Sequence, residues 1–98
     1  MKKHSYIIVR NDLSRAQQLI QSCHAIWELR FRNKHPSLVV VVVKNENKLL
    51  KLMKILDIND IKYSIFEDSD LKVGITAIAT EPLSDEKRII FKKYQLLK

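Results

Sequence analysis

Apolar runs along this chain predict four β-strands. Residues 6–9 form a short β-branched run, which is typical of a strand. Residues 38–43 are an unbroken aliphatic run that ends in five consecutive valines. Because this run is apolar on both faces, it predicts a strand in the centre of a sheet that is covered on both sides. Residues 61–66 and 73–80 predict two further strands, the second of which ends before Pro82.

Three segments between or after these runs have helical spacing. The longest covers residues 14–32, where apolar side chains recur every three or four positions and predict a stripe that faces the core. A second helix follows Asn45, a residue type that caps helix N-termini, and a third runs from Ser84 to about Phe91. The predicted core-facing stripe of the first helix consists of Ala16, Ile20, Cys23, Trp27 and Phe31.

The elements follow the order β-α-β-α-β-β-α over a single domain, residues 1–98. This order predicts a three-layer α/β domain in which a mixed four-stranded sheet has helices on both faces. Right-handed crossovers would place the two long helices against the sheet. The strand order does not follow from the pattern, and a split β-α-β arrangement is one possibility. A composition of 46% hydrophobic and 30% charged residues is typical of a soluble globular domain.

Targeting signals and cofactor motifs are absent from the sequence. No apolar run approaches the roughly 20 residues that span a bilayer, and the basic start turns polar again at Arg10, too early for a signal peptide. We therefore expect a cytoplasmic protein without a membrane partner. Gly74 is the only glycine, which excludes a glycine-rich phosphate loop. The histidines, His4, His24 and His35, lack the spacing of a zinc site, so we expect neither metal nor cofactor.

The single cysteine is predicted to be a buried and unreactive thiol. Cys23 lies on the apolar stripe of the first helix. His24 is its neighbour, but consecutive side chains on a helix point about 100° apart, so the two cannot pair as nucleophile and base. One cysteine also cannot form an internal disulfide.

The charge of the chain indicates an anionic partner. Lys and Arg number 18 against 11 Asp and Glu, which gives a net charge of +7. Nucleic acid is the commonest partner for such an excess. The alternative is that lysines on solvated helix faces keep a small protein soluble, and the charge does not decide between the two.

The first helix also carries a polar stripe, formed by Gln17, Gln21, His24 and Glu28. Their spacing of four, three and four residues places them in a narrow arc. A solvated helix face and a functional site at the rim of the core are both compatible with this spacing.

A series of motifs extends over nearly the whole chain. Residues 10–13 read Arg-Asn-Asp-Leu and residues 21–25 read Gln-Ser-Cys-His-Ala. A valine-rich strand, a lysine-rich helix, Glu67-Asp68 and the Thr-Ala-Ile-Ala of residues 76–79 follow. This order resembles the type 2 peptidyl-tRNA hydrolases of archaea and eukaryotes and their short bacterial relatives, which have a strand, Arg-x-Asp-Leu, and a helix with Gln-Cys-Ser-His-Ala.

The resemblance implies an α/β domain, often dimeric, that cleaves the ester between a peptide and the terminal ribose of tRNA. Gln21, His24, Asp68 and Thr76 match the site residues of the family. Asp68 would orient or deprotonate a water molecule, while Gln21 and Thr76 would donate to the carbonyl oxygen. The expected RNA-binding residues are Arg10, Arg15, Gln17, Arg30, Arg32 and Lys34, although the charges at 30, 32 and 34 could instead complement the helix dipole.

Two departures from the family leave two hypotheses open. The family has a lysine in a glycine-rich turn at the start of the helix, where this chain has Gln17; Arg15 is a nearby cation but has a different geometry. The loop between Asp68 and Thr76 is also shorter than in the family. The chain is therefore either an ester hydrolase that acts on peptidyl-tRNA or a similar acyl-RNA, or a non-catalytic relative that binds RNA or another protein.

The last part of the chain is rich in apolar residues, namely Ile89, Ile90, Phe91, Leu96 and Leu97. A chain of this size cannot easily cover so many apolar residues alone, and a homodimer would cover them. The alternative is that they complete the core of the monomer.

Overall fold

The structure is a computed structural model that describes residues 3–29 and 36–97. Its sheet has five strands in the order β3-β4-β1-β2-β5. β1 and β2 are parallel, whereas the other neighbouring pairs are antiparallel. The elements are β1 (His4–Arg10), α1 (Arg15–Leu29), β2 (Ser37–Val43), α2 (Glu46–Ile58), β3 (Tyr63–Glu67), β4 (Ile75–Thr80), α3 (Asp85–Arg88), the 3₁₀ turn η1 (Ile89–Phe91) and β5 (Gln95–Leu96).

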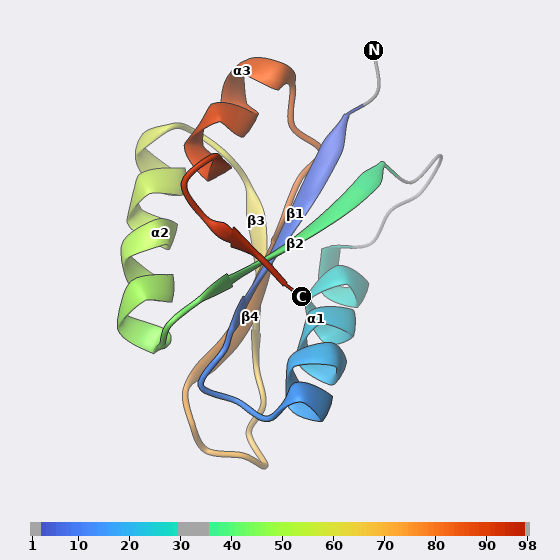
Figure 1. Cartoon of the computed structure of the whole chain (residues 1–98), viewed down its shortest axis with the longest axis vertical. Coiled ribbons are helices and arrows are strands. Elements are labelled where there is room, and N and C mark those ends of the chain that lie inside the picture. The colour runs from blue at the N-terminus through green and yellow to red at the C-terminus, as the bar shows by residue number, and fades with distance from the viewer. Residues whose placement is uncertain (1–2, 30–35, 98) are drawn as a thin grey trace.

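The predicted fold class, α/β with a mixed sheet, is confirmed, but the predicted number of strands and the element order are wrong. The chain continues beyond the third helix into β5, which pairs with β2 and makes a fifth strand. β5 has only two residues. Two residues are too short to show the alternation of apolar and polar positions by which a strand is recognised. The chain also crosses from β2 through α2 to β3 at the opposite edge of the sheet, over β1 and β4 (Figure 1).

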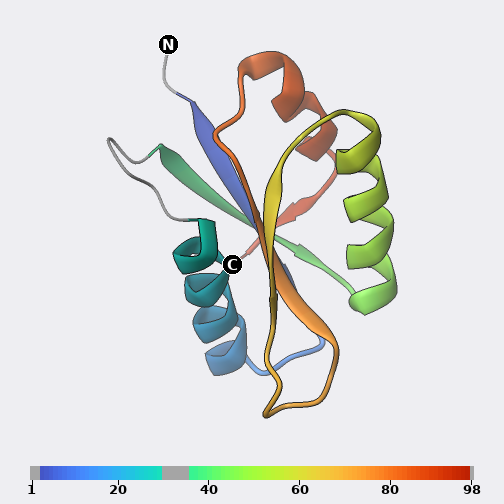
Figure 2. The same cartoon turned by 180° about the vertical axis from the view of Figure 1, so that it is seen from behind.

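The helices lie on both faces of the sheet, and each face has its own core (Figures 1 and 2). Alternate residues of β1 enter different cores, with Ile8 on the face covered by α2 and α3 and Ile7 on the face covered by α1. The α2 side holds the larger cluster, which includes Leu49, Leu52 and Leu56 of that helix. The cluster on the α1 side is smaller and rich in alanine.

The central strand is β1 and not the valine run. Six of the seven residues of β1 are buried, whereas only the last three residues of β2 are buried and Leu38 is 45% exposed. β2 therefore lies one place from the edge, and the prediction of a fully covered central strand is wrong for its first half. The reason is that β5 pairs only with Val41 and Val42 and leaves the rest of that side of β2 open.

The predicted N-terminus of α2 is confirmed in detail. Asn45 has extended backbone angles, and its side-chain oxygen accepts a hydrogen bond from the backbone N–H of Lys48 at 3.1 Å. This contact satisfies one of the N–H groups that a helix start leaves without a partner. None of the helices in residues 3–29 and 36–97 is long and apolar enough to cross a membrane.

The orientation of α1 is the reverse of the predicted one. The stripe expected in the core faces solvent, with Trp27 80% and Ile20 44% exposed, and Ala16 and Cys23 exposed as well. The prediction of a buried thiol is therefore wrong. Phe31, the last member of that stripe, lies outside the described residues. The buried residues of α1 are Gln18, Gln21, Ser22 and Ala25.

Internal hydrogen bonds explain why α1 can place its polar side against the sheet. The Ser22 hydroxyl donates to the Gln18 carbonyl oxygen at 2.7 Å, and the Gln18 amide donates to the Leu13 carbonyl oxygen at 2.8 Å. Buried polar groups that have partners cost little, so hydrophobicity does not decide the orientation alone. The strand beneath contributes Ala77 and Ala79, whose small side chains allow the helix to approach closely.

Candidate functional site

Gln21 is the centre of a hydrogen-bonded cluster that joins three separate parts of the chain. It lies on α1 and is completely buried. Its side-chain nitrogen Nε2 donates to Gln17 Oε1 at 2.9 Å and to Asp68 Oδ2 at 3.0 Å, while its Oε1 accepts from the Thr76 hydroxyl at 2.9 Å. We call these four residues, Gln17, Gln21, Asp68 and Thr76, the glutamine network. Figure 2 shows how the loop between β3 and β4 approaches the first turns of α1.

A β-bulge turns the side chain of Thr76 toward α1. Phe66 of β3 pairs with Ala77 of β4, and the next residue, Glu67, pairs with Ile75, so Thr76 is an extra residue in β4. Ile75 packs against the core under α2 and Ala77 lies in the core under α1. The bulge therefore allows the consecutive residues Thr76 and Ala77 to face the same side, which regular alternation would forbid.

The segment before Thr76 is fixed by charged side chains from two other elements. The Arg10 guanidinium at the end of β1 donates to the carbonyl oxygens of Val73 and Ile75. Two further bonds, of 3.0 and 2.8 Å, join Arg10 to the carboxylate of Asp12. The Glu46 carboxylate, in the first turn of α2, accepts from the Ile75 backbone N–H at 2.7 Å. These contacts fix the backbone immediately before the bulge.

Asp68 is an ionised group at the partly exposed end of the network. A side-chain hydrogen bond from Gln21 is the main reason why the pKa of Asp68 lies below its ordinary value. The backbone N–H groups of Asp70 and Leu71 and the nearby His24 lower the pKa of Asp68 further, and partial burial opposes them. Because these groups favour the charged form, Asp68 carries its negative charge at neutral pH.

The charge of Asp68 sets the direction of every hydrogen bond in the network. A carboxylate only accepts, so the amide nitrogen of Gln21 must face Asp68, and its oxygen then faces Thr76. The second hydrogen on the Gln21 nitrogen requires an acceptor, which is the oxygen of Gln17. The amide oxygen of Gln17 thus faces Gln21, and its amide nitrogen points away from Gln21. Within the described chain, this N–H₂ group has no acceptor.

His24 lies near the network but does not bond to it. Its ring packs against Phe66, with ring centroids 4.3 Å apart and the planes at 42°. Its Nδ1 atom is buried and has no hydrogen-bond partner among residues 3–29 and 36–97. Ser64, two residues before Phe66, donates to the Ala25 carbonyl oxygen at 2.8 Å and so attaches β3 to the same helix.

The structure thus brings together three of the four residues expected at the catalytic site, with the fourth, His24, beside them. It also brings in Gln17, which was expected only as an RNA-binding residue. The roles of Glu46 and Arg10 in holding the loop were not predicted. A glutamate in the first turn of a helix is normally assigned to the helix dipole, and no local signal connects it to Ile75, which lies 29 residues away.

The residues expected to bind RNA are distributed differently. Arg10 is only 7% exposed, and its guanidinium is bonded within the protein, so contact with a phosphate would require an exchange of partners. Arg15 is exposed on the first turn of α1, close in sequence to Gln17. Arg30, Arg32 and Lys34 lie outside the described residues. In the described part of the chain, no three His, Cys, Asp or Glu side chains come together in a way that could hold a metal ion.

Comparison with known proteins shows the fold alone. The structure superposes on that of a protein of unknown function from Agrobacterium tumefaciens strain C58 with a TM-score of 0.74, over 100% of this chain and 99% of the other, at 14% sequence identity. No family model matches the sequence. No curated protein matches it significantly either. The fold is therefore shared with a chain of about the same length that has a very different sequence.

Proposed function

We propose that this chain hydrolyses the ester of peptidyl-tRNA, or of a similar acyl-RNA, in the cytoplasm. One observation carries the proposal. Residues that match the hydrolase motifs, from segments 47 and 55 residues apart, meet in one hydrogen-bonded network. At its outer end the network has an N–H donor, on Gln17, beside an ionised carboxylate, on Asp68. Ester hydrolysis needs both groups, a donor for the carbonyl oxygen and an acceptor for the attacking water.

In the proposed reaction, Asp68 accepts a hydrogen bond from the water molecule and directs its oxygen toward the carbonyl carbon. The bond between that carbon and the ribose oxygen breaks, and the water proton passes to the ribose oxygen as it leaves. A carboxylate with a lowered pKa is a weak base, so Asp68 orients the water more than it deprotonates it. Gln17 donates to the carbonyl oxygen as negative charge develops there, in place of the lysine of the family.

Gln21 and Thr76 act in this proposal as positioning residues. Both side chains are completely buried, and both hydrogens of the Gln21 amide nitrogen already have acceptors. The Thr76 hydroxyl hydrogen is shared between Gln21 and the Phe66 carbonyl oxygen. Direct donation from these two residues to the substrate was the expectation from sequence, but their hydrogens are occupied.

The same burial favours a second candidate, a non-catalytic module that binds RNA. A network whose central residues, Gln21 and Thr76, are buried and hydrogen-bonded also serves simply to fix α1 to the β3–β4 loop. In that case the net charge of +7 would supply the affinity for RNA. This candidate predicts RNA binding that weakens as salt is raised, without hydrolysis.

The test is the release of the acyl amino acid from N-acetyl-aminoacyl-tRNA. Asp68→Asn keeps the shape of the side chain and removes its charge, while Asp70→Asn changes an exposed carboxylate in the same loop and is the matched control. We expect the wild type and Asp70→Asn to release the acyl amino acid and Asp68→Asn to lose this activity. A fully active Asp68→Asn would refute the proposed role. A wild type that binds RNA in a salt-dependent way but does not cleave would favour the second candidate.

We further propose that two copies pair through the outward face of α1. Ala16, Ile20, Cys23 and Trp27 are separated by four, three and four residues, which is the spacing of a coiled-coil seam, and they carry no charge in a strongly basic protein. A two-fold axis between antiparallel helices would place Trp27 opposite Ala16, and Ile20 opposite Cys23. Each pair of facing residues across the axis then combines a larger side chain with a smaller one.

A further inference from the structure

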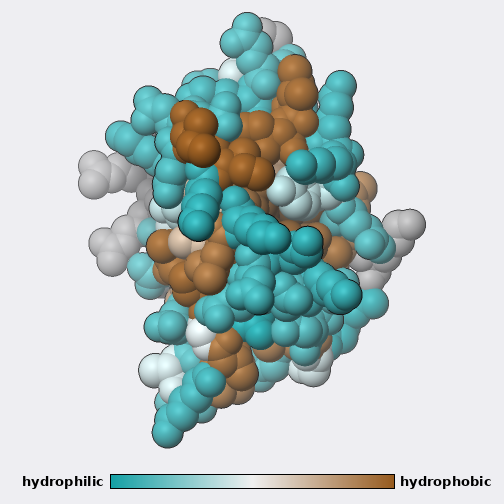
Figure 3. Space-filling view, turned by 90° about the vertical axis from the view of Figure 1, so that its left-hand side faces the viewer, coloured by the Kyte–Doolittle hydropathy of each residue, from teal (hydrophilic) through white to brown (hydrophobic). Residues whose placement is uncertain are grey.

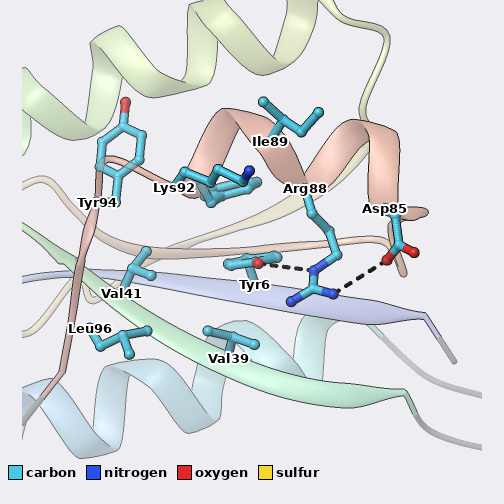
Figure 4. Close-up of a pocket in the computed structure, with 10 residues that line it drawn as sticks. Tyr6, Val39, Val41, Asp85, Arg88, Ile89, Lys92, Tyr94 and Leu96 are labelled. Carbon is cyan, nitrogen blue, oxygen red and sulfur yellow. Dashed lines mark hydrogen bonds and ion pairs between the residues drawn. The ribbon is translucent and has the colours of Figure 1, made fainter.

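A cavity of about 650 Å³ lies on the face of the sheet opposite to the glutamine network. Its floor is formed by β1 and β2, and α3 and η1 form the wall above it (Figure 4). The volume is within the range of small-molecule sites, roughly 300–1,000 Å³. From the side that α2 covers, the surface is mainly hydrophilic, and hydrophobic residues gather toward the end where α3 lies (Figure 3).

The apolar side of the cavity is formed largely by β2 and β5. Val39 and Val41 of β2 line it from the same face of the sheet. Leu96 and Ile89 border the same space and are 54% and 60% exposed. Val39, Val41 and Leu96 therefore form an apolar floor on which an aliphatic or aromatic group could be buried (Figure 4).

The opposite wall holds an arginine in a fixed orientation. Arg88 Nε donates to the Tyr6 hydroxyl at 3.1 Å, and Nη1 donates to Asp85 at 3.4 Å (Figure 4). The Tyr6 ring is itself stacked on Phe91, with centroids 4.1 Å apart and planes at 8°. A guanidinium supported from two sides loses little freedom when it binds a ligand.

The charges around the cavity add up to one positive charge. Arg88 and Lys92 supply two cations and Asp85 one carboxylate. Within the described part of the chain, Nη2 of Arg88 has no acceptor and Lys92 has no ion-pair partner. The planar guanidinium edge fits a carboxylate, and one net positive charge matches a singly charged ligand better than a doubly charged phosphate.

We propose that this cavity binds a small amphipathic monocarboxylate. Its carboxylate would contact the free edge of Arg88 and the ammonium of Lys92, and its apolar body would lie on Val39, Val41 and Leu96. The site shares no residue with the glutamine network, so this inference does not depend on the proposed ester hydrolysis and adds a binding activity to it.

Titration of the whole ¹⁵N-labelled protein with octanoate, followed by NMR, tests the proposal. We expect shifts concentrated on the backbone amides of residues 39–41 and 88–92, with octanol and acetate each binding more weakly because each supplies half of the ligand. Arg88→Gln should weaken octanoate binding by about tenfold or more, the equivalent of one charge-assisted hydrogen bond. Lys87→Gln removes the same charge from the exposed side of the same helix and should leave the affinity within about twofold of wild type.

Three results would overturn the proposal. They are octanoate shifts spread evenly over the basic surface, equal affinity in Arg88→Gln and wild type, and tighter binding of octyl phosphate than of octanoate. Arg88→Gln also removes a partner of Tyr6, so its fold is checked by its spectrum without ligand. If that variant is unfolded, Lys92→Gln replaces it, because Lys92 is exposed and its loss should weaken octanoate without a structural change.

Discussion

The amide nitrogen of Gln21 lies 3.0 Å from the carboxylate of Asp68, and this single contact fixes the direction of the bonds around it. Because the carboxylate can only accept, the amide of Gln21 has one permitted orientation, and the amide of Gln17 then has one as well. The pair formed by the Asp68 carboxylate and the buried Gln21 amide thus determines which atom of the Gln17 side chain is presented to a ligand. Substitutions at position 17 test this relationship directly.

Gln17→Glu should abolish hydrolysis without unfolding the protein. Glutamate has the same shape and still offers an oxygen to the Gln21 amide, but it cannot donate on its outer side. Gln17→Lys should instead raise turnover by about tenfold, since a charged donor stabilises developing negative charge better than a neutral one. Release of acyl amino acid from N-acetyl-aminoacyl-tRNA measures both. If Gln17→Glu is as active as wild type, Gln17 is not the donor to the carbonyl oxygen.

The lowered pKa of Asp68 predicts how stability depends on pH. Its folded-state pKa lies below the ordinary value of about 3.9, so ionisation of Asp68 stabilises the fold. This contribution is fully present above about pH 4 and is lost as the pH falls through the lower folded-state pKa. Urea unfolding should therefore show wild type more stable than Asp68→Asn at pH 7 and pH 5, with the difference shrinking as the pH falls below about 4. A difference that does not change with pH would contradict this explanation.

Gly74→Ala should destabilise the protein and displace the bulge that carries Thr76. Gly74 has a φ of +83°, and an added Cβ would clash with the Glu46 carboxylate. The left-handed backbone alone costs an alanine roughly 1–2 kcal/mol. We expect a loss of at least this free energy of unfolding together with a loss of turnover.

A double variant separates the two causes of the Gly74 effect. Glu46→Ala removes the carboxylate that the new Cβ would meet, so Glu46→Ala combined with Gly74→Ala should be less destabilised than the sum of the single changes. Ser69→Ala, at an exposed position of the same loop, is the control and should stay within about 0.5 kcal/mol of wild type. Strict additivity in the double variant would show that the contact with Glu46 does not limit substitution at Gly74.

The fold and the site were predictable to different degrees from sequence. α2 could be predicted in detail because a local cap and a regular apolar face both mark it: Asn45 caps the helix as expected, and Leu49, Leu52 and Leu56 are buried. The members of the network could be named only through a resemblance, since Gln21, Asp68 and Thr76 are far apart in the chain. That Thr76 faces α1 depends on a bulge, which no alternation of residues reveals.

The orientation of α1 could not be predicted because the usual assumption fails there. An amphipathic helix is expected to bury its apolar stripe, since burial of a polar side chain costs free energy unless the core supplies a hydrogen-bond partner. In this chain Gln18, Gln21 and Ser22 have internal partners, so the polar side can be buried and the apolar side is left for another contact. The sequence pattern identified two stripes on the helix, but it placed the apolar stripe in the core, whereas the structure exposes that stripe to solvent.

Trp27→Ser should separate the proposed dimer into monomers while leaving the monomer stable. Trp27 is 80% exposed, so its loss removes little packing within one chain, and the free energy of unfolding should change by no more than about 0.5 kcal/mol. Light scattering should show wild type at twice the chain mass of 11.5 kDa and Trp27→Ser at that mass. Leu50→Ser, at a 37% exposed position of α2, is the control and should remain dimeric. A monomeric wild type would contradict the pairing.

The reactivity of the Cys23 thiol provides an independent test of the proposed pairing through the outward face of α1. Because the thiol is exposed in one chain, a disulfide reagent should modify it in the folded protein without denaturant, in contrast to the behaviour of a buried cysteine. If two copies pair through α1, Cys23 lies in the seam, and the rate of modification should fall as the protein concentration rises through the dimerisation range. In Trp27→Ser the rate should be high at every concentration. A rate that is the same at all concentrations in wild type would place the interface elsewhere, whereas an unreactive thiol in Trp27→Ser would show that this face of α1 is covered within the monomer.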